Sequence, residues 1–204
     1  MKRALLVIDV QNEYFSDNFP VEYPPTRVTL PHIGQAIDAA RAADIPIVVV
    51  QHSAPAGSPI FAKGSSGWEL HPEVARRGHD HLVEKTKASS FSGTDLREWL
   101  AARGIDTLTI VGYMTHNCDA ATTFDAAHAG LSVEILSDAS GSLPYANRAG
   151  SATAEEIHRV FTVVFQSNFG AVMSTAEWLE SVRQGRAPER DNILMSNRRA
   201  RGVA

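Results

Sequence analysis

The sequence predicts an α/β fold: a single-domain, three-layer α/β/α sandwich around a mostly parallel, doubly wound, Rossmann-like sheet. Short apolar runs rich in β-branched residues alternate along the chain with segments of helical period. This pattern is typical of parallel strands that helices cover on both faces. The 204 residues suffice for one domain with a sizeable core, and they contain no internal repeat.

The predicted elements follow in order from the start of the chain. Residues 1–3 lead directly into an apolar run that is too short for a secretory signal, and we interpret it as the first strand. The predicted strands cover residues 4–10, 46–50, 81–84, 107–111, 132–136 and 171–173. The predicted helices cover 31–43, 94–104 with Thr94 as its N-cap, 119–130 with Asn117 as its N-cap, 154–166 and 175–183.

Two segments fall outside this alternation. Residues 53–67 are rich in Gly, Pro and Ser, which predicts a surface excursion near the carboxyl edge of the second strand. From Gln184 onward the chain is polar, with five arginines and no helical period. We therefore expect one folded domain over 1–183, followed by residues 184–204 as a disordered tail or an arm that a partner orders.

Composition excludes several classes of partner. The net charge of −4 argues against nucleic acid and against anionic membranes. No apolar run approaches the ~20 residues that would span a bilayer. The single cysteine excludes an internal disulfide and fits a reducing compartment, so the predicted location is the cytoplasm.

The only cysteine, Cys118, lies between the predicted strand 107–111 and the following helix. A thiol at the start of a helix lies at the positive end of the helix dipole, which predicts a lowered pKa and a reactive thiolate. The alternative is a small buried hydrophobic residue, the commonest role of a free cysteine.

Two further reactive residues follow predicted strands. Asp9 closes the first strand and Lys85 follows the third. Ligands of a doubly wound sheet bind at the carboxyl ends of its strands, so these residues and Cys118 are candidates for one site. There the lysine would stabilise a thiolate and the carboxylate would carry its proton to a leaving group. Alternatively, Asp9 caps a loop and Lys85 is solvated.

Five segments carry a resemblance to a known family. They are residues 6–12 (LVIDVQN), 84–96 (EKTKASSFSGTDL), 111–118 (VGYMTHNC), 137–140 (SDAS) and 168–172 (NFGAV). In this order and spacing the chain resembles the isochorismatase-like cysteine hydrolases, which include nicotinamidases and N-carbamoylsarcosine amidase. The resemblance covers roughly residues 3 to 180.

The resemblance implies a catalytic triad of Asp9, Lys85 and Cys118, with Lys85 preferred over Lys87. It also implies a cis peptide between Tyr113 and Met114, and an oxyanion hole made by the backbone N–H groups of Met114 and Cys118. A homodimer or homotetramer is implied as well. The implied substrate-binding residues are Tyr14, His52, Trp68 and Tyr113.

The chain departs from the family pattern at two places. Asp119 stands where the family usually has a small aliphatic residue, and it would oppose a low thiol pKa if it turned inward. The metal motif of nicotinamidases is missing after the second strand, so we expect no metal and no cofactor, with His52 and His71 in other roles. We therefore expect a thiol-dependent hydrolase of a small amide or imide. The alternatives are vinyl-ether hydrolysis with Asp9 as the acid, and a non-catalytic binding protein.

Overall fold

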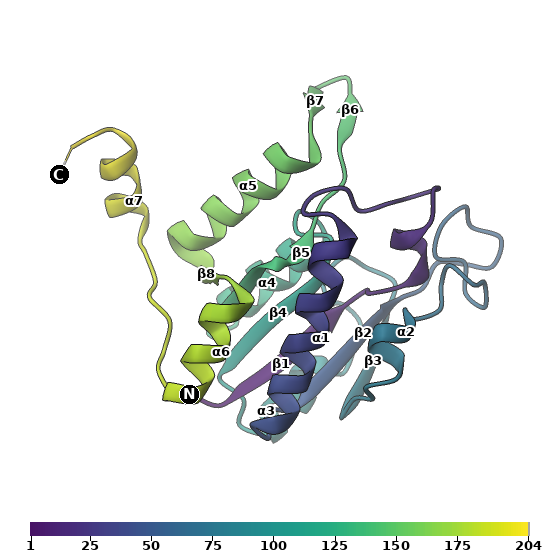
Figure 1. Ribbon diagram of the computed structural model, residues 1–204, viewed down its shortest axis with the longest axis horizontal. Coiled ribbons are helices and arrows are strands. Elements are labelled where there is room, and N and C mark those ends of the chain that lie inside the picture. Colours follow the sequence, from purple (N-terminus) through teal and green to yellow (C-terminus); the bar gives the residue numbers. More distant parts are fainter. Residues whose placement is uncertain (204) are drawn as a thin grey trace.

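The computed structural model describes residues 1–203 and has a six-stranded sheet at its centre (Figure 1). The strands lie in the order β3-β2-β1-β4-β5-β8, and every neighbouring pair is parallel. The predicted α/β class with a parallel sheet is therefore confirmed. The strands are β1 (Arg3–Ile8), β2 (Ile47–His52), β3 (His81–Lys85), β4 (Thr107–Tyr113), β5 (Ser132–Gly141) and β8 (Ala171–Met173).

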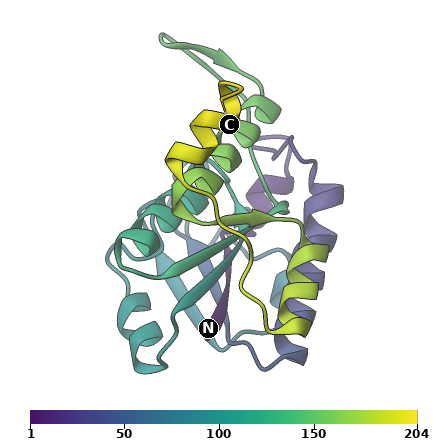
Figure 2. The ribbon, with the colours of Figure 1, turned by 90° about the vertical axis from the view of Figure 1, so that its left-hand side faces the viewer.

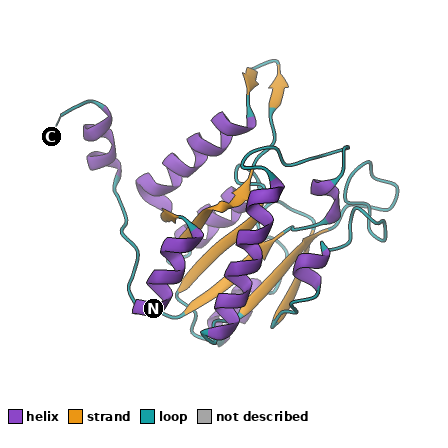
Figure 3. Ribbon diagram, in the orientation of Figure 1, coloured by secondary structure: helices purple, strands orange, loops and turns teal. Residues whose placement is uncertain are grey.

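Helices cover both faces of this sheet (Figures 2 and 3). One face carries α1 (Thr26–Ala42), α2 (Pro72–Ala75) and α6 (Thr175–Gln184). The other carries α3 (Leu96–Ala102), α4 (Cys118–His128) and the π-helical turn η2 (Phe165–Phe169), which continues α5 (Ala154–Val164). None of the helices within residues 1–203 is long and apolar enough to cross a membrane.

Strand alternation divides the core into two clusters. Leu5 and Val7 of β1 face α1 and α6, where Trp178 is fully buried. Leu6 and Ile8 of the same strand face the opposite cluster under α3 and α4. Because successive side chains of a strand point to opposite faces, a strand buried on both faces is apolar throughout.

Several boundaries differ from the predicted ones. Helix α1 begins five residues earlier than predicted and runs through Pro31. Burial of Ile33 and Ile37 against the sheet outweighs the one backbone hydrogen bond that proline removes. Strand β5 continues to Gly141, with a register shift against β4 between Ile110 and Gly112.

A projecting hairpin separates β5 from α5 and was not predicted (Figure 1). Its strands are β6 (Tyr145–Asn147) and β7 (Gly150–Ala152), which pair antiparallel. All but one of its strand residues are exposed, so the segment lacks the apolar alternation that predicts a strand.

The C-terminal arm, residues 185–203, contains a helix that the sequence did not predict. Helix α7 (Ile193–Ala200) begins after Asn192, whose side chain accepts a hydrogen bond from the Met195 N–H at 2.9 Å. The absence of a helical period misled the prediction, because this helix buries none of its residues. The last residue of the predicted 184–204 segment lies outside the described residues.

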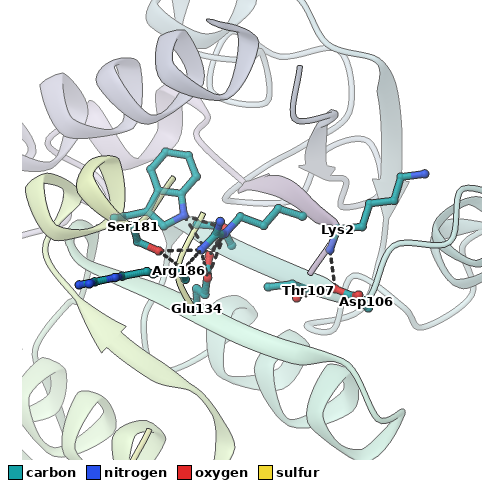
Figure 4. Close-up of polar contacts among 9 residues, drawn as sticks. Lys2, Asp106, Thr107, Glu134, Ser181 and Arg186 are labelled. Atoms are coloured by element: carbon teal, nitrogen blue, oxygen red, sulfur yellow. Dashed lines mark hydrogen bonds and ion pairs between the residues drawn. The ribbon is translucent and has the colours of Figure 1, made fainter. Parts of the chain in front are cut away.

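The arm begins at a buried ion pair at the amino end of the sheet (Figure 4). Arg3 donates through Nε and Nη2 to the Glu134 carboxylate at 2.8–3.0 Å. Arg3 Nη2 and Ser181 Oγ both donate to the Arg186 carbonyl, at 3.1 and 2.7 Å. The start of the arm is thereby fixed to β1 and β5, at the end of the sheet opposite to the strand carboxyl ends.

Candidate active site

The sheet reverses its strand order between β1 and β4. From β1 the chain proceeds to β2 and β3 on one side, and from β4 to β5 and β8 on the other. The carboxyl ends of β1 and β4 therefore form the switch point at which such sheets bind ligands. Asp9 directly follows β1, and Cys118 follows β4 after a short turn.

The structure brings the three predicted triad residues together at this point. Lys85 Nζ lies 2.6 Å from Asp9 Oδ2 and 3.2 Å from Cys118 Sγ. The exposed fractions of Asp9, Lys85 and Cys118 are 0%, 2% and 6%. One ammonium thus contacts both a carboxylate and a thiol in a site with almost no access to solvent from the single chain.

The backbone explains how Asp9 reaches this position. Asp9 has a φ of 52°, in the left-handed region, and its N–H donates to the Val50 carbonyl of β2 at 2.9 Å. Its own carbonyl accepts from the Gln11 N–H at 2.8 Å, which closes a tight turn. The chain therefore leaves β1 sharply, with the carboxylate directed to the neighbouring strand ends.

The two oxygens of Asp9 have different surroundings. Oδ2 accepts from Lys85, whereas Oδ1 is buried and has no hydrogen-bond partner among the described residues. A buried carboxylate oxygen without a donor is costly. It is therefore the natural acceptor for a proton that leaves the Cys118 thiol.

The predicted low pKa of Cys118 is wrong for this resting site. Burial raises the pKa of the thiol well above its usual value, the Asp9 carboxylate raises it further, and the Lys85 ammonium opposes both. For Lys85, burial lowers the pKa, but the charges of Asp9 and Cys118 outweigh that effect and leave it raised. The resting site therefore holds a neutral thiol beside a protonated lysine.

The predicted N-caps of two helices also differ from the structure. Asn117 precedes α4, but its side chain makes no capping hydrogen bond. Asp95, not Thr94, directly precedes α3, although Thr94 Oγ1 accepts from the Leu96 N–H at 3.4 Å.

Gln11 is a site residue whose role sequence reasoning missed. Its Nε2 donates to the carbonyls of His52 and Trp68 at 2.9 and 2.7 Å, and its Oε1 accepts from the His52 N–H at 2.9 Å. It is fully buried, so it fixes the excursion after β2 against β1. Its only signal was a polar residue two positions after Asp9 in the motif at residues 6–12.

His52 ends β2 beside the triad, and Trp68 directly follows the excursion over residues 53–67. His52 Nδ1 is 3.5 Å from Lys85 Nζ, and both burial and the lysine charge lower the pKa of its ring. Trp68 is half-buried and donates through Nε1 to Ser53 Oγ at 2.7 Å. These two side chains can contact a substrate that approaches the lysine.

Tyr14 and Tyr113 were predicted to bind substrate, but both side chains are buried in the single chain. Their exposed fractions are 2% and 0%, and their ring centroids are 5.3 Å apart. The Tyr113 hydroxyl lies 2.6 Å from Thr29 Oγ1. Within a single chain both tyrosines therefore belong to the core behind the site.

The turn between β4 and α4 carries the two predicted oxyanion donors. The peptide bond between Tyr113 and Met114 is cis. The Met114 carbonyl accepts from the N–H groups of Asn117 and Asp119, at 3.0 and 3.2 Å. The N–H groups of Met114 and Cys118 make no such bond to another described residue, so both donors are available to a ligand.

The remaining histidines of interest have structural partners. Within residues 1–203, no group of three or more His, Cys, Asp or Glu side chains could hold a metal ion. His71 Nδ1 accepts from the Glu73 N–H at 3.1 Å and caps α2. His116 lies 3.1 Å from Ser142 Oγ and 3.0 Å from the hydroxyl of Tyr145, a hairpin residue that carried no sequence signal.

Comparison with known proteins assigns the family. A family model described as the isochorismatase domain matches residues 3–177. The chain belongs to the isochorismatase family. It is therefore a member of the isochorismatase-like hydrolases, as the five sequence segments implied.

Three relatives of this isochorismatase-family chain show how far the similarity reaches. A crystal structure classed as an isochorismatase, from Burkholderia xenovorans LB400, has a TM-score of 0.97 and 60% identity over 98% of this chain and 97% of that one. The secreted isochorismatase effector Isc1 of Verticillium dahliae is 34% identical over 68% of this chain and 72% of its own. N-carbamoylsarcosine amidase from Thermoplasma acidophilum has a TM-score of 0.70 and 26% identity over 86% of this chain and 97% of that one.

Proposed function

We propose that the protein hydrolyses a C–N bond of a small amide or imide through a covalent acyl-enzyme on Cys118. The observation that carries this proposal is the contact of Lys85 Nζ with both Asp9 and Cys118 in a buried site. A nucleophile, a general base and a fixed cation within hydrogen-bond reach of one another are the parts that acyl transfer requires.

The first half-reaction begins from the neutral thiol. Asp9 Oδ1 accepts the thiol proton while Sγ bonds to the substrate carbonyl carbon, and the carbonyl π electrons move to oxygen. The backbone N–H groups of Met114 and Cys118 donate to this oxyanion. Lys85 stays protonated and stabilises the negative charge on sulfur. The oxyanion then collapses, the C–N bond breaks, and Asp9 gives its proton to the leaving nitrogen.

The second half-reaction releases the acyl group. Asp9 takes a proton from a water molecule as the water oxygen attacks the thioester carbon. When the C–S bond breaks, that proton returns to sulfur and the product leaves as a carboxylic acid or carbamic acid. One water is consumed, an amine or ammonia is released from an amide or an amide group from an imide, and the site returns to a thiol, a carboxylate and an ammonium.

The raised pKa of Cys118 fits this sequence of steps. A thiol that is already ionised needs no base, whereas a neutral thiol does. We assign that base to the unpartnered Asp9 Oδ1, since Lys85 Nζ contacts both this carboxylate and the thiol. The raised pKa therefore supports deprotonation of the thiol by a general base during the attack, and not a thiolate that is already present before the substrate binds.

The proposed substrate contacts are His52 and Trp68 at the site, with Tyr14 and Tyr113 behind it. The proposed assembly is a homodimer or homotetramer, since the exposed apolar residues of α7 need a partner surface. A catalytic free thiol fits a reducing compartment, so we retain the cytoplasm as the proposed location.

Vinyl-ether hydrolysis is a second candidate, and the family's name is the observation that favours it. In that reaction a protonated Asp9 would donate to the substrate carbon and Cys118 would take no part. A non-catalytic role is the third alternative, and it predicts no turnover of any compound of either class.

A screen of small amides, ureides and imides with detection of ammonia tests the proposal. We expect release by the wild-type protein and a loss of about 10³-fold or more in kcat for Cys118→Ala. The control is Thr123→Ala, which changes a buried side chain of α4 five positions after Cys118. Amide turnover that survives in Cys118→Ala, or vinyl-ether turnover without amide turnover, would contradict the proposal.

A further inference from the structure

Four buried side chains form a hydrogen-bonded chain that ends beside Cys118. Asp119 Oδ2 lies 2.6 Å from Ser140 Oγ, Ser140 Oγ lies 2.6 Å from Thr115 Oγ1, and Thr115 Oγ1 lies 2.9 Å from His158 Nδ1. The exposed fractions of these side chains are 0% for the first three and 6% for His158. The chain therefore connects the first turn of α4 to α5 without passing through solvent.

The number of hydrogens in this chain is set by its contacts. Three short contacts need three hydrogens, one in each. The hydroxyl groups of Ser140 and Thr115 supply two. The third must lie at one end of the chain, either on the carboxyl of Asp119 or on Nδ1 of His158.

We propose that Asp119 and His158 share this third proton through Ser140 and Thr115, and that Asp119 thereby acts as a positioning residue for the turn that carries Cys118. The inference rests on the proposed function for its effect on turnover, but the shared proton itself does not depend on that function. When Asp119 is neutral, its carboxyl donates to Ser140, and the hydrogens of the chain all point toward His158. When Asp119 is ionised, the hydrogens all point the other way, so that His158 Nδ1 must carry one.

The buried surroundings of Asp119 place the proton on its carboxyl below about pH 7. Asp119 Oδ1 is buried without a partner among the described residues, which disfavours the carboxylate. With the hydrogen of the neutral ring on Nε2, His158 Nδ1 is the acceptor for Thr115 Oγ1 at 2.9 Å in this state.

The surrounding charges support the same assignment. Burial raises the pKa of Asp119 to about 7; the Ser140 hydrogen bond and Lys85 oppose the rise, and Asp9 adds to it. Burial lowers the pKa of His158 to about 4, so its ring is neutral at pH 7. The titratable groups that face the Asp119 end of the chain are Asp9, Tyr14, Lys85 and Tyr113, and those that face the His158 end are Tyr23 and His116.

The chain passes through the residue that follows the oxyanion turn. The Thr115 N–H donates to the Gly141 carbonyl at 2.9 Å, and Thr115 directly follows Met114. The Thr115 side chain is also bonded to β5, through Ser140 Oγ at 2.6 Å, and reversal of the hydrogens changes which of these two hydroxyl groups donates. We expect turnover to fall as Asp119 ionises.

The test is the ¹⁵N NMR spectrum of His158 across pH 5.5 to 8.5, in the wild-type protein and in Asp119→Asn. The asparagine amide donates to Ser140 as the neutral acid does, but it cannot ionise. We expect the wild-type ring to change from the Nε2–H to the Nδ1–H tautomer as pH rises through about 7, and the variant to keep Nε2–H throughout. Asp125→Asn, which removes one charge from the same helix, is the matched control and should behave as wild type.

The pH profile of turnover gives the second readout. Above about pH 7 we expect wild-type kcat/KM to fall up to ~10-fold per pH unit, as for loss of one proton, and Asp119→Asn to lack this decline. A His158 tautomer independent of pH in the wild-type protein would overturn the shared proton. A tautomer change without any amide turnover would overturn the proposed function alone. A tautomer change with an alkaline decline that persists in Asp119→Asn would overturn the positioning role.

Discussion

Lys85 Nζ lies 2.6 Å from Asp9 Oδ2, and neither side chain has any exposed surface. Removal of one partner of such a pair leaves an uncompensated buried charge, which costs about 3–5 kcal/mol of stability. Loss of activity in an Asp9 or Lys85 variant therefore does not by itself prove a catalytic role. An activity assay of such a variant therefore needs a parallel measurement of thiol reactivity, of stability or of mass.

The Asp9→Asn variant should separate thiol ionisation from catalysis. Burial is the largest cause of the raised pKa of Cys118, and the negative charge of Asp9 is the second. Removal of the Asp9 charge should therefore lower the pKa of the thiol and speed its alkylation by iodoacetamide near pH 7. Turnover should nevertheless be lost, because the general base is gone. The control is Asp125→Asn. Slower alkylation in Asp9→Asn than in wild type would contradict the assigned charge pattern.

Stability should depend on pH through Asp119. Its pKa in the folded protein is raised from 3.8 to about 7, so its contribution is fully present below pH 3.8 and is lost as pH rises through about 7. Asp119→Asn should therefore gain stability relative to wild type across this interval, by at most about 4 kcal/mol. His116 and His158, each with a pKa lowered to about 4, change stability in the opposite direction in both proteins.

Urea unfolding at pH 4, 5.5 and 7 measures this difference. The free energy of unfolding of Asp119→Asn minus that of wild type should increase with pH. A difference that stays constant over the three values would show that Asp119 is ionised in the folded protein throughout.

The C-terminal arm should contribute to assembly. In helix α7, Ile193 is 63% exposed and Leu194 is 59% exposed. Exposed apolar side chains that lie together favour burial against a partner surface. We expect light scattering to give a multiple of 22.1 kDa at micromolar concentration. Ile193→Glu should weaken association without lowering the stability of the chain, whereas Leu82→Glu, a control on β3, should not. The mass of a single chain for wild type would refute this expectation.

Turnover should not depend on a metal ion. The proposed mechanism assigns the base, the cation and the oxyanion donors to Asp9, Lys85 and two backbone N–H groups, which leaves no electrophilic task for Zn²⁺. Extended dialysis against EDTA should leave the rate of ammonia release unchanged. Loss of activity that added Zn²⁺ restores would show that His52 or His71 had been misinterpreted.

The sheet and the triad could be predicted from sequence because both follow from short-range patterns. Apolar β-branched runs such as residues 107–111 mark buried strands, and the carboxyl ends of parallel strands meet at one edge. That rule alone brings Asp9, Lys85 and Cys118 to one place. The α7 helix and the β6–β7 hairpin were missed because neither buries the apolar face that produces a readable period.

Electrostatic properties of the site could not be predicted in the same way. A helix start lowers a thiol pKa, but Cys118 is buried next to a carboxylate, and these effects outweigh the dipole. Whether Asp119 turned inward depended on a hydroxyl of Ser140, a residue of β5 that is 21 positions away. The pKa of Cys118 and the orientation of Asp119 depend on burial and on residues far away in the sequence, so neither could be predicted from the neighbouring residues alone.

In the proposed mechanism, Cys118 carries the acyl group during turnover. Intact-mass spectrometry after rapid acid quench of the wild-type protein with its best amide substrate tests it most directly. We expect an added mass equal to that of the substrate minus its amine, located by peptide mapping on Cys118, and absent in Cys118→Ala. Rapid amide turnover without any such adduct, or with undiminished rate in Cys118→Ala, would contradict the account.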